Sequence, residues 1–475
     1  MVETLRVGTS GDYAPFSHWP EGASAPSGFS VDVARAFAQA RGARIEWVRF
    51  GWSELALDLA AGRFELALSG ITVRPDRSTL GRFSLPLTTT SATALVLSDS
   101  RLATPADLER PGLRIAVNRG GHLERVARTT FARARIEAVE GNAAVPARLA
   151  DGRADAVLTD DLEAPLWQRA LPPTRAIGPL TRDRKAAWFP LDQEDLLLAF
   201  DRWLLAAEAS GELARLRARH GLADSPTAAP LPALLARLDE RLALMPGVAR
   251  AKQALALPIR DPAQEARVHT AARESAARAA REFGVEPPRD SALRRFVDAQ
   301  LAAARFVQDR ERAGHARAET DRRVEATAGT RSNDAPDADA DGDAPTSARR
   351  AEVARAELDE RLRPAVAYLM DRSVWLAVAS TAERRAESAN GARASDAATP
   401  PASVSREAVA DALADHALPP ELVTELHSAL EALEAARPEA RDPGRRTPVT
   451  APPHATPRAR ACPARPAPRD TTPSA

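Results

Sequence analysis

Cysteine is almost absent from this chain, which has 475 residues and one cysteine, Cys462. That excludes an internal disulfide framework and any metal site built from cysteine ligands, and it leaves the redox compartment undetermined. No run approaches the roughly 20 apolar residues of a membrane span. The chain opens MVETLRVGTS, without the apolar region of a secretory signal peptide. From the residues alone we expect neither a membrane span nor an export signal.

Net charge and lysine are also lacking. The 65 basic and 65 acidic residues balance, so no global field favours nucleic acid or a membrane surface as a partner. Arginine takes nearly every basic position, and lysine occurs only at Lys185 and Lys252. Each lysine is therefore informative where it falls beside other candidate site residues.

Two patterned regions divide the chain. Across residues 4–224 short apolar strands alternate with helical stretches, which is typical of an α/β fold. Residues 225–232 (SPTAAPLP) have the composition of a linker. Beyond them lies a region at 233–435. Its residues 233–310 and 349–435 are rich in Ala, Leu, Arg and Glu with helical periodicity, broken at LPIRDP and by Pro287 and Pro288. This second region is predicted to be an all-helical domain.

Two segments are expected to lie outside the folded domains: an acidic insert at 313–348 and a Pro/Arg-rich tail at 436–475, which have few apolar residues to offset ordering entropy. The insert contains a D-x-D-x-D-G pattern beginning at Asp337, but Ala348 stands where a calcium loop has its bidentate glutamate. No H-E-x-x-H, P-loop or G-x-S-x-G motif occurs either. We therefore predict no metal and no other cofactor.

Two features of the α/β region favour a cleft that binds a small carboxylate. Gly120 and Gly121 follow the apolar run RIAVN and precede a helical stretch, and glycines there let backbone amides approach an anion. Arg77, in SGITVRPDRS, can offer a bidentate guanidinium to a carboxylate. Taken singly, an ordinary turn and a solvated arginine remain the simpler alternatives.

Five ordered segments resemble the cyclohexadienyl dehydratases, enzymes on the scaffold of amino-acid-binding proteins: GTSGDYAPFS, SGITVRPDR, VNRGGHLERVAR, VLTDDLEA and RKAAWFPLD. The resemblance implies a two-lobed periplasmic-binding-protein-like fold that dehydrates and decarboxylates prephenate or arogenate. It places the general acid at Glu163, where a raised pKa would allow protonation of the leaving hydroxyl, and it places Lys185 in a strand lining the cleft. Without the resemblance, Glu163 would be assigned as a surface residue.

This sequence departs from that family beside the paired glycines. His122 and Leu123 stand where the family has Thr and Asn, which removes two polar contacts to the substrate carboxylate, and Ser30 replaces an aspartate. A binding protein for an acidic amino acid or keto acid, without catalysis, is therefore the second hypothesis.

In the helical region, Arg241 and Lys252 are eleven residues apart, about three helical turns, so both cations share one face. Pro246 is expected to kink the helix between them. Composition alone favours a bundle with an Ala/Leu core and solvated arginines.

The runs RLDERLALMPGVARAKQALALPIRDPAQEAR, FVDAQLAAARFVQ and LRPAVAYLMDR resemble the secreted chorismate mutases. The resemblance implies a rearrangement of chorismate to prephenate that needs positioning and hydrogen-bond donors, but no nucleophile, acid or metal. Arg241 and Arg372 would bind carboxylates, Lys252 and Gln308 would donate to the ether oxygen, and Glu265 would contact the substrate hydroxyl.

Two positions break the mutase pattern: Gln264 replaces an arginine and Ala304 replaces Ser or Thr, with Arg260 and Arg267 as candidates to compensate. In tandem, the two resemblances predict a bifunctional enzyme of phenylalanine biosynthesis with chorismate and prephenate as its small-molecule partners. They also imply a periplasmic or secreted protein. A homo-oligomer stays open, as does a purely structural role for the helices.

Overall fold

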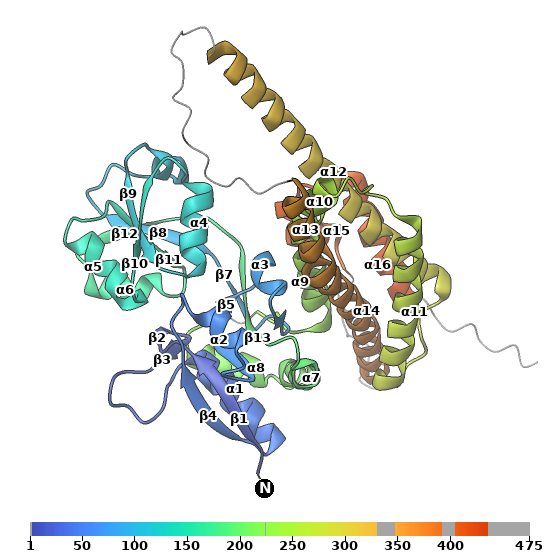
Figure 1. The fold of residues 1–475 in the computed structure, drawn as a ribbon. Coiled ribbons are helices and arrows are strands. Elements are labelled where there is room, and N and C mark those ends of the chain that lie inside the picture. Colours follow the sequence, from blue (N-terminus) through green and yellow to red (C-terminus); the bar gives the residue numbers. More distant parts are fainter. Residues whose placement is uncertain (1, 224, 330–346, 392–403, 436–475) are drawn as a thin grey trace, which may run out of the picture. The chain divides into compact units, whose positions relative to one another are not determined.

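The computed structural model describes residues 2–223, 225–329, 347–391 and 404–435. They form an α/β domain of two lobes followed by an all-helical domain (Figure 1), which confirms the fold class that the two sequence patterns predict. The tail with Cys462 and the aspartate pattern at Asp337 lie outside the described residues.

The first lobe is built on a six-stranded sheet in the order β4-β1-β5-β13-β6, with β7 also paired to β13. Its strands are β1 (Thr4–Thr9), β4 (Arg44–Arg49), β5 (Leu66–Thr72), β6 (Arg82–Phe83), β7 (Thr88–Thr90) and β13 (Asp183–Phe189). β1 runs parallel to β4 and β5, and β13 runs antiparallel to β5. Every residue of β5 is buried, which explains why LALSGIT is an almost continuous apolar run.

A short hairpin and five helices complete this lobe. They are β2 (Asp12–Tyr13), β3 (Ser17–His18), α1 (Phe29–Arg41), α2 (Leu55–Ala60), α3 (Pro75–Ser78), α7 (Glu194–Ala209) and α8 (Glu212–Arg219). The short helix α3 follows β5 directly, so it carries its side chains at the carboxyl end of a buried central strand.

The second lobe is a five-stranded sheet in the order β10-β9-β11-β8-β12. Its elements are β8 (Ala92–Leu97), β9 (Arg114–Asn118), β10 (Arg135–Val139), β11 (Ala156–Asp160), β12 (Thr174–Ile177), α4 (His122–Thr130), α5 (Val145–Ala150), α6 (Ala164–Ala170) and the 3₁₀ turns at Pro105–Glu109 and Asn142–Ala144. One hydrophobic cluster joins α4 to the sheet and another joins α5 and α6 to it. The chain passes between the lobes twice, from β7 to β8 and from β12 to β13.

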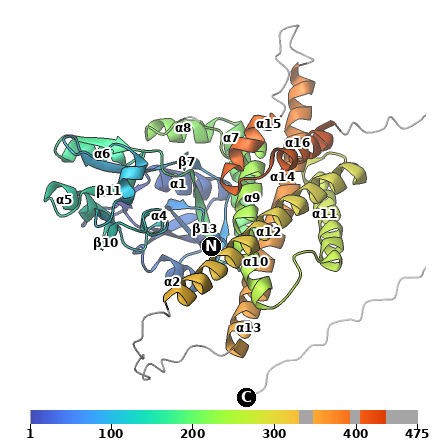
Figure 2. The same ribbon diagram turned by 90° about the horizontal axis from the view of Figure 1, so that it is seen from above.

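The helical domain contains eight α-helices among the described residues: α9 (Pro230–Ala243), α10 (Met245–Ala254), α11 (Pro262–Phe283), α12 (Asp290–Gly329), α13 (Ser347–Ala356), α14 (Arg363–Gly391), α15 (Arg406–Ala412) and α16 (Pro420–Ala435). A π-helical turn spans Glu357–Leu362 and a 3₁₀ turn spans Ala414–His416. α14 packs against α9 and α11, and α12 packs against α10 and α16 (Figure 2). No described helix combines the length and apolarity needed to cross a membrane.

The predicted helix breaks are confirmed. α9 ends at Ala243 and α10 begins at Met245, so the helix is interrupted at Leu244, two residues before Pro246. LPIRDP separates α10 from α11, and Pro287 and Pro288 lie between α11 and α12. Proline lacks the amide and clashes with the preceding turn, so each of these runs stops a helix.

Two expectations about boundaries differ from the structure. α12 continues to Gly329, so residues 313–329 of the expected insert are helical; Ala, Arg and Glu favour helix and extend one that is already formed. The expected linker at 225–232 is also packed: Thr227 Oγ1 donates to the Pro86 carbonyl at 2.9 Å, and α9 begins within it at Pro230.

Buried polar contacts join α9 to the first lobe. Arg237 Nη2 donates to the Phe83 carbonyl at 2.8 Å, and Ser78 Oγ donates to Glu240 Oε1 at 2.7 Å. Ser78 ends α3, the same short helix that carries Arg77. The position of Arg77 is thus tied to the helical domain through its neighbour.

Candidate functional site

The first candidate site is a cavity lined by residues of both lobes. Its lining includes three predicted residues, Arg77, Gly121 and Lys185. The other lining residues are Tyr13, Trp52, Gly70, Thr72, Asn118, His122, Leu123 and Asn142. We call this cavity the cleft.

Arg77 is a buried cation, with 4% of its surface exposed. Its Nη1 donates to the Thr72 carbonyl at 3.3 Å, and its guanidinium lies 5.8 Å from the centre of the Trp188 ring. Burial, helped by the charge of Arg74, lowers the pKa of Arg77 to about 9, so it stays protonated at neutral pH. Among the described residues no carboxylate forms an ion pair with it, which suits it to an anionic ligand.

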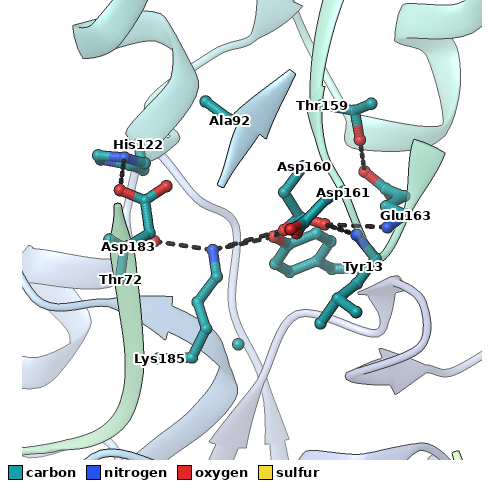
Figure 3. A network of polar contacts seen from close by, with 12 residues as sticks. Tyr13, Thr72, Ala92, His122, Thr159, Asp160, Asp161, Glu163, Asp183 and Lys185 are labelled. Carbon is teal, nitrogen blue, oxygen red and sulfur yellow. Dashed lines mark hydrogen bonds and ion pairs between the residues drawn. The ribbon is translucent and has the colours of Figure 1, made fainter. Parts of the chain in front are cut away.

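Lys185 joins the two lobes across the cleft (Figure 3). Its Nζ donates to Tyr13 Oη at 3.0 Å and to Thr72 Oγ1 at 2.9 Å, and lies 3.5 Å from Asp160 Oδ2. Tyr13 also donates its hydroxyl proton to Asp160. Burial first, and then the charge of Asp160, raise the pKa of Tyr13, so the phenol stays neutral beside the lysine.

Glu163 has the electrostatic character expected of a general acid. It is 3% exposed, and burial together with the neighbouring charge of Asp160 raises its pKa well above the ordinary value, against hydrogen bonds from Thr159 and Asn142. Those donors lie 2.7 Å from Oε2 and 2.6 Å from Oε1 respectively. Glu163 is not part of the cleft lining; Asn142, which bonds it, is. The acid assignment therefore stays a prediction.

The paired glycines have separate roles. Gly120 adopts φ +70°, and a Cβ there would lie 2.6 Å from the Ser53 Cα, so only glycine fits this turn. Its amide donates to Glu124 Oε2 at 2.8 Å and does not line the cleft, unlike Gly121. The structure therefore brings one of the two predicted glycines to the site.

The second candidate site is a cavity in the helical domain, which we call the helical pocket. Arg241, Lys252, Glu265 and Gln308 all line it, as the resemblance implies. Arg241 and Lys252 belong to a stripe with Met245 at spacings of four, seven and eleven residues, so the break before Pro246 preserves their shared face.

The polar groups of the helical pocket are held in place. Arg241 is 4% exposed, its Nη1 donates to the Gln300 carbonyl at 3.2 Å, and burial lowers its pKa to about 10. Lys252 Nζ donates to the Ile259 carbonyl at 2.7 Å. Gln308 Nε2 donates to the Ala304 carbonyl at 3.2 Å. The pocket thus gathers donors and cations, as binding of a dianion requires.

Arg372 is the predicted residue that the structure does not bring to this pocket. Its Nη2 lies 3.3 Å from Asp201 Oδ2 of α7, and its guanidinium stacks 3.8 Å from the Trp375 ring centre. Pocket-lining residues of α14 begin at Arg363, nine residues earlier, and nine residues are about two and a half helical turns. Arg372 therefore projects from the opposite face of the helix.

Two arginines that line the helical pocket are not among the residues that the resemblance implies. Arg305 Nη1 bonds Glu265 Oε1 at 2.8 Å, and Arg363 lines the pocket from α14. Arg260 and Arg267, the candidates to compensate for Gln264, do not line it. Helical spacing is the sequence signal that could have identified them. Residues 301, 304, 305 and 308 lie on one face of their helix, and residues 363, 366, 367 and 370 lie on one face of theirs.

No group of three or more histidine, cysteine, aspartate or glutamate side chains in the described part of the chain is arranged to hold a metal ion. The cleft instead offers two buried cationic side chains, Arg77 and Lys185, at the junction of two lobes, which is a place where small-molecule sites commonly occur.

Comparison with known proteins identifies the family of the α/β domain. The model of bacterial extracellular solute-binding proteins, family 3, matches residues 5–223. The cyclohexadienyl dehydratase of Pseudomonas aeruginosa is 36% identical over 223 residues, covering 46% of this chain and 82% of that enzyme. Through its α/β domain, the chain belongs to the family 3 bacterial extracellular solute-binding proteins.

Other similar proteins are named as amino-acid-binding proteins. The L-cystine-binding protein of Escherichia coli is 26% identical, covering 45% of this chain and 80% of that protein. An ancestral amino-acid-binding protein, described as a precursor of cyclohexadienyl dehydratase, has a crystal structure 30% identical to the matched region, covering 46% of this chain and 95% of that one, with a TM-score of 0.43. These matches concern the α/β domain.

Proposed function

We propose that this chain is a bifunctional enzyme of phenylalanine biosynthesis. The helical domain rearranges chorismate to prephenate, and the cleft dehydrates and decarboxylates prephenate, or arogenate, to phenylpyruvate, or phenylalanine. The observation that carries the dehydratase half is the 36% identity to a cyclohexadienyl dehydratase over 82% of that enzyme. The mutase half rests on the resemblance of the helical runs and on the residues that line the helical pocket. By the same kinship we propose a periplasmic or secreted location.

The cleft has the groups that dehydration needs. Arg77 and Lys185 are buried cations that bind the carboxylates of the substrate. Glu163, neutral because burial raises its pKa, gives its proton to the ring hydroxyl, which leaves as water. The ring carboxylate departs as carbon dioxide, and the electrons of the broken carbon–carbon bond complete the aromatic ring. Glu163 and Asn142 belong to the same lobe, so this transfer requires a local shift within that lobe that brings Glu163 past Asn142 to the substrate.

The helical pocket has the groups that a pericyclic rearrangement needs. Arg241 and Arg363 bind the two carboxylates and hold the substrate compact, while Lys252 and Gln308 donate to the ether oxygen as it gains negative charge. Glu265, held by Arg305, contacts the hydroxyl. Arg305 and Arg363 supply positive charge that Gln264 lacks.

A binding protein without catalysis is the second candidate. It is favoured by the amino-acid-binding relatives and by the position of Glu163 behind Asn142. In that case the cleft takes a carboxylate ligand and releases it unchanged.

Two assays separate these candidates. The purified full-length protein is incubated with chorismate, whose absorbance is followed, and separately with prephenate, with phenylpyruvate measured after alkali. We expect both substrates to be consumed. A protein that consumes neither, yet melts at a higher temperature with a carboxylate ligand, is a binding protein.

A further inference from the structure

His122 lines the cleft but has no task in the proposed reaction. It is the first residue of α4, and its Nε2 lies 2.9 Å from Oδ1 of Asp183, the first residue of β13 (Figure 3). The other oxygen of Asp183 accepts a hydrogen bond from Thr181 Oγ1 at 2.9 Å. Both carboxylate oxygens are therefore engaged, which fixes the carboxylate and, through it, the orientation of the imidazole ring.

The pair determines which ring nitrogen carries the proton. Burial opposes ionisation of Asp183, but hydrogen bonds from His122 and Thr181 and the charge of Lys185 outweigh it and hold its pKa below the ordinary value. An ionised carboxylate only accepts, so Nε2 of His122 donates. In the neutral ring Nδ1 is then an acceptor. It is buried and makes no hydrogen bond within the described part of the chain.

The surroundings of His122 are those of a carboxylate site. Arg74 Nη1 donates to the Gly121 carbonyl at 3.4 Å, directly before His122. The charged groups that face this end of the cleft are Asp183 and Lys185 from β13, Arg74, Asp76 and Arg77 from the β5–α3 segment, and Arg125 from α4 itself. Burial, with the charges of Lys185 and Arg74, lowers the pKa of His122 in spite of Asp183. A residue that lines the cleft therefore carries an unpartnered lone pair beside cations that attract an anion.

We propose that a carboxylate ligand enters the cleft together with a proton, which His122 takes up on Nδ1. The imidazolium then donates to the ligand carboxylate through Nδ1 while Nε2 remains bonded to Asp183. The negative charge of the ligand offsets Lys185 and Arg74, the two cations that oppose protonation of His122. His122 is thus a ligand-binding residue whose contact depends on pH.

The sign of the pH dependence follows from linkage. Binding raises the pKa of His122, so affinity is highest below the pKa of the free protein and falls as pH rises through the pKa of the complex. Between those two values the dissociation constant increases about tenfold for each pH unit. A cleft that binds carboxylates through fixed charges alone shows no such slope.

Calorimetry tests this with phenylpyruvate, a probe that rests on the proposed function. The full-length protein is titrated at pH 7.5 in phosphate, HEPES and Tris, whose ionisation enthalpies differ, so the slope of heat against that enthalpy counts protons. We expect net proton uptake in the unaltered protein and none in His122→Asn, whose amide donates without titrating. His220→Asn is the matched control, because His220 bonds Asp32 at 2.8 Å away from the cleft lining, and it should keep the uptake.

Prephenate turnover is measured in the same preparations, so that the two proposals fail separately. Binding of phenylpyruvate without proton uptake, in a protein that turns over prephenate, overturns the role of His122 alone. Proton uptake that persists in His122→Asn shows that another group takes up the proton, and it also overturns the role of His122. A protein that neither binds phenylpyruvate nor consumes prephenate overturns both.

Discussion

Replacing Glu163 by glutamine should slow dehydration strongly while making the protein less sensitive to alkali. Thr159 Oγ1 and Asn142 Nδ2 donate to the two carboxylate oxygens. In the variant the glutamine oxygen accepts from Asn142, and the threonine hydroxyl rotates to accept from the new amide, since a hydroxyl serves as donor or acceptor. The side chain should therefore fit without a new cavity.

The magnitude has two parts. Loss of a positioned general acid lowers turnover by about 10²–10⁴-fold. The raised pKa of Glu163 in the folded state also means that its contribution to stability is complete below the unfolded pKa of about 4.3 and is lost as pH rises through the folded pKa. Within that window the loss is about 1.4 kcal/mol for each pH unit. Glutamine does not titrate, so the variant avoids this loss.

The assay compares prephenate turnover and urea unfolding at pH 5 and pH 8 for the unaltered protein, Glu163→Gln and Glu140→Gln. Glu140 has an exposed side chain and serves as the matched control. We expect turnover of Glu163→Gln to fall by about 10²–10⁴-fold and its stability to rise relative to the unaltered protein as pH rises. Turnover retained in Glu163→Gln, or a stability difference that does not grow with pH, would refute the reasoning.

Three further changes test the two sites. Arg372→Met should lower the free energy of unfolding by about 3–5 kcal/mol, because it leaves Asp201 buried without its partner, while Arg363→Met should leave stability nearly unchanged and raise the KM for chorismate. Equal KM values for both variants would contradict the assignment of Arg363 to the pocket. Lys252→Ala should cut chorismate turnover by about 10²-fold or more; unchanged turnover removes that donor. Arg77→Lys should weaken prephenate binding, read as a higher KM, since a point charge cannot bond a carboxylate bidentately; an unaltered KM contradicts direct contact.

Periodicity predicted the fold class, and prolines predicted three interruptions of the helical region, because both signals act locally. The alternation of strands and helices before residue 225 and the breaks at Pro246, Pro287 and Pro288 all correspond to the observed elements. The extension of α12 to Gly329 did not follow from apolar content. Helix propensity of Ala, Arg and Glu continues a helix through exposed residues such as those at 313–320, whereas apolar content reports only on burial.

The site residues were predictable where a stripe or a resemblance constrained them. Arg77, Lys185, Arg241 and Lys252 all line cavities. Arg372 lies outside the pocket that was predicted for it, because a resemblance at one position does not determine which face of the helix a side chain occupies. Contacts between distant segments carry no local pattern, which is why the bond of Tyr13 to Asp160 and that of His122 to Asp183 were not foreseen.

The most direct test of the account supplies chorismate alone to the purified protein and follows the products over time. The account predicts that prephenate forms first and phenylpyruvate follows, with both steps present in one chain. Chorismate that remains intact, while added prephenate is also returned unchanged, would contradict the claim that this chain carries two active sites.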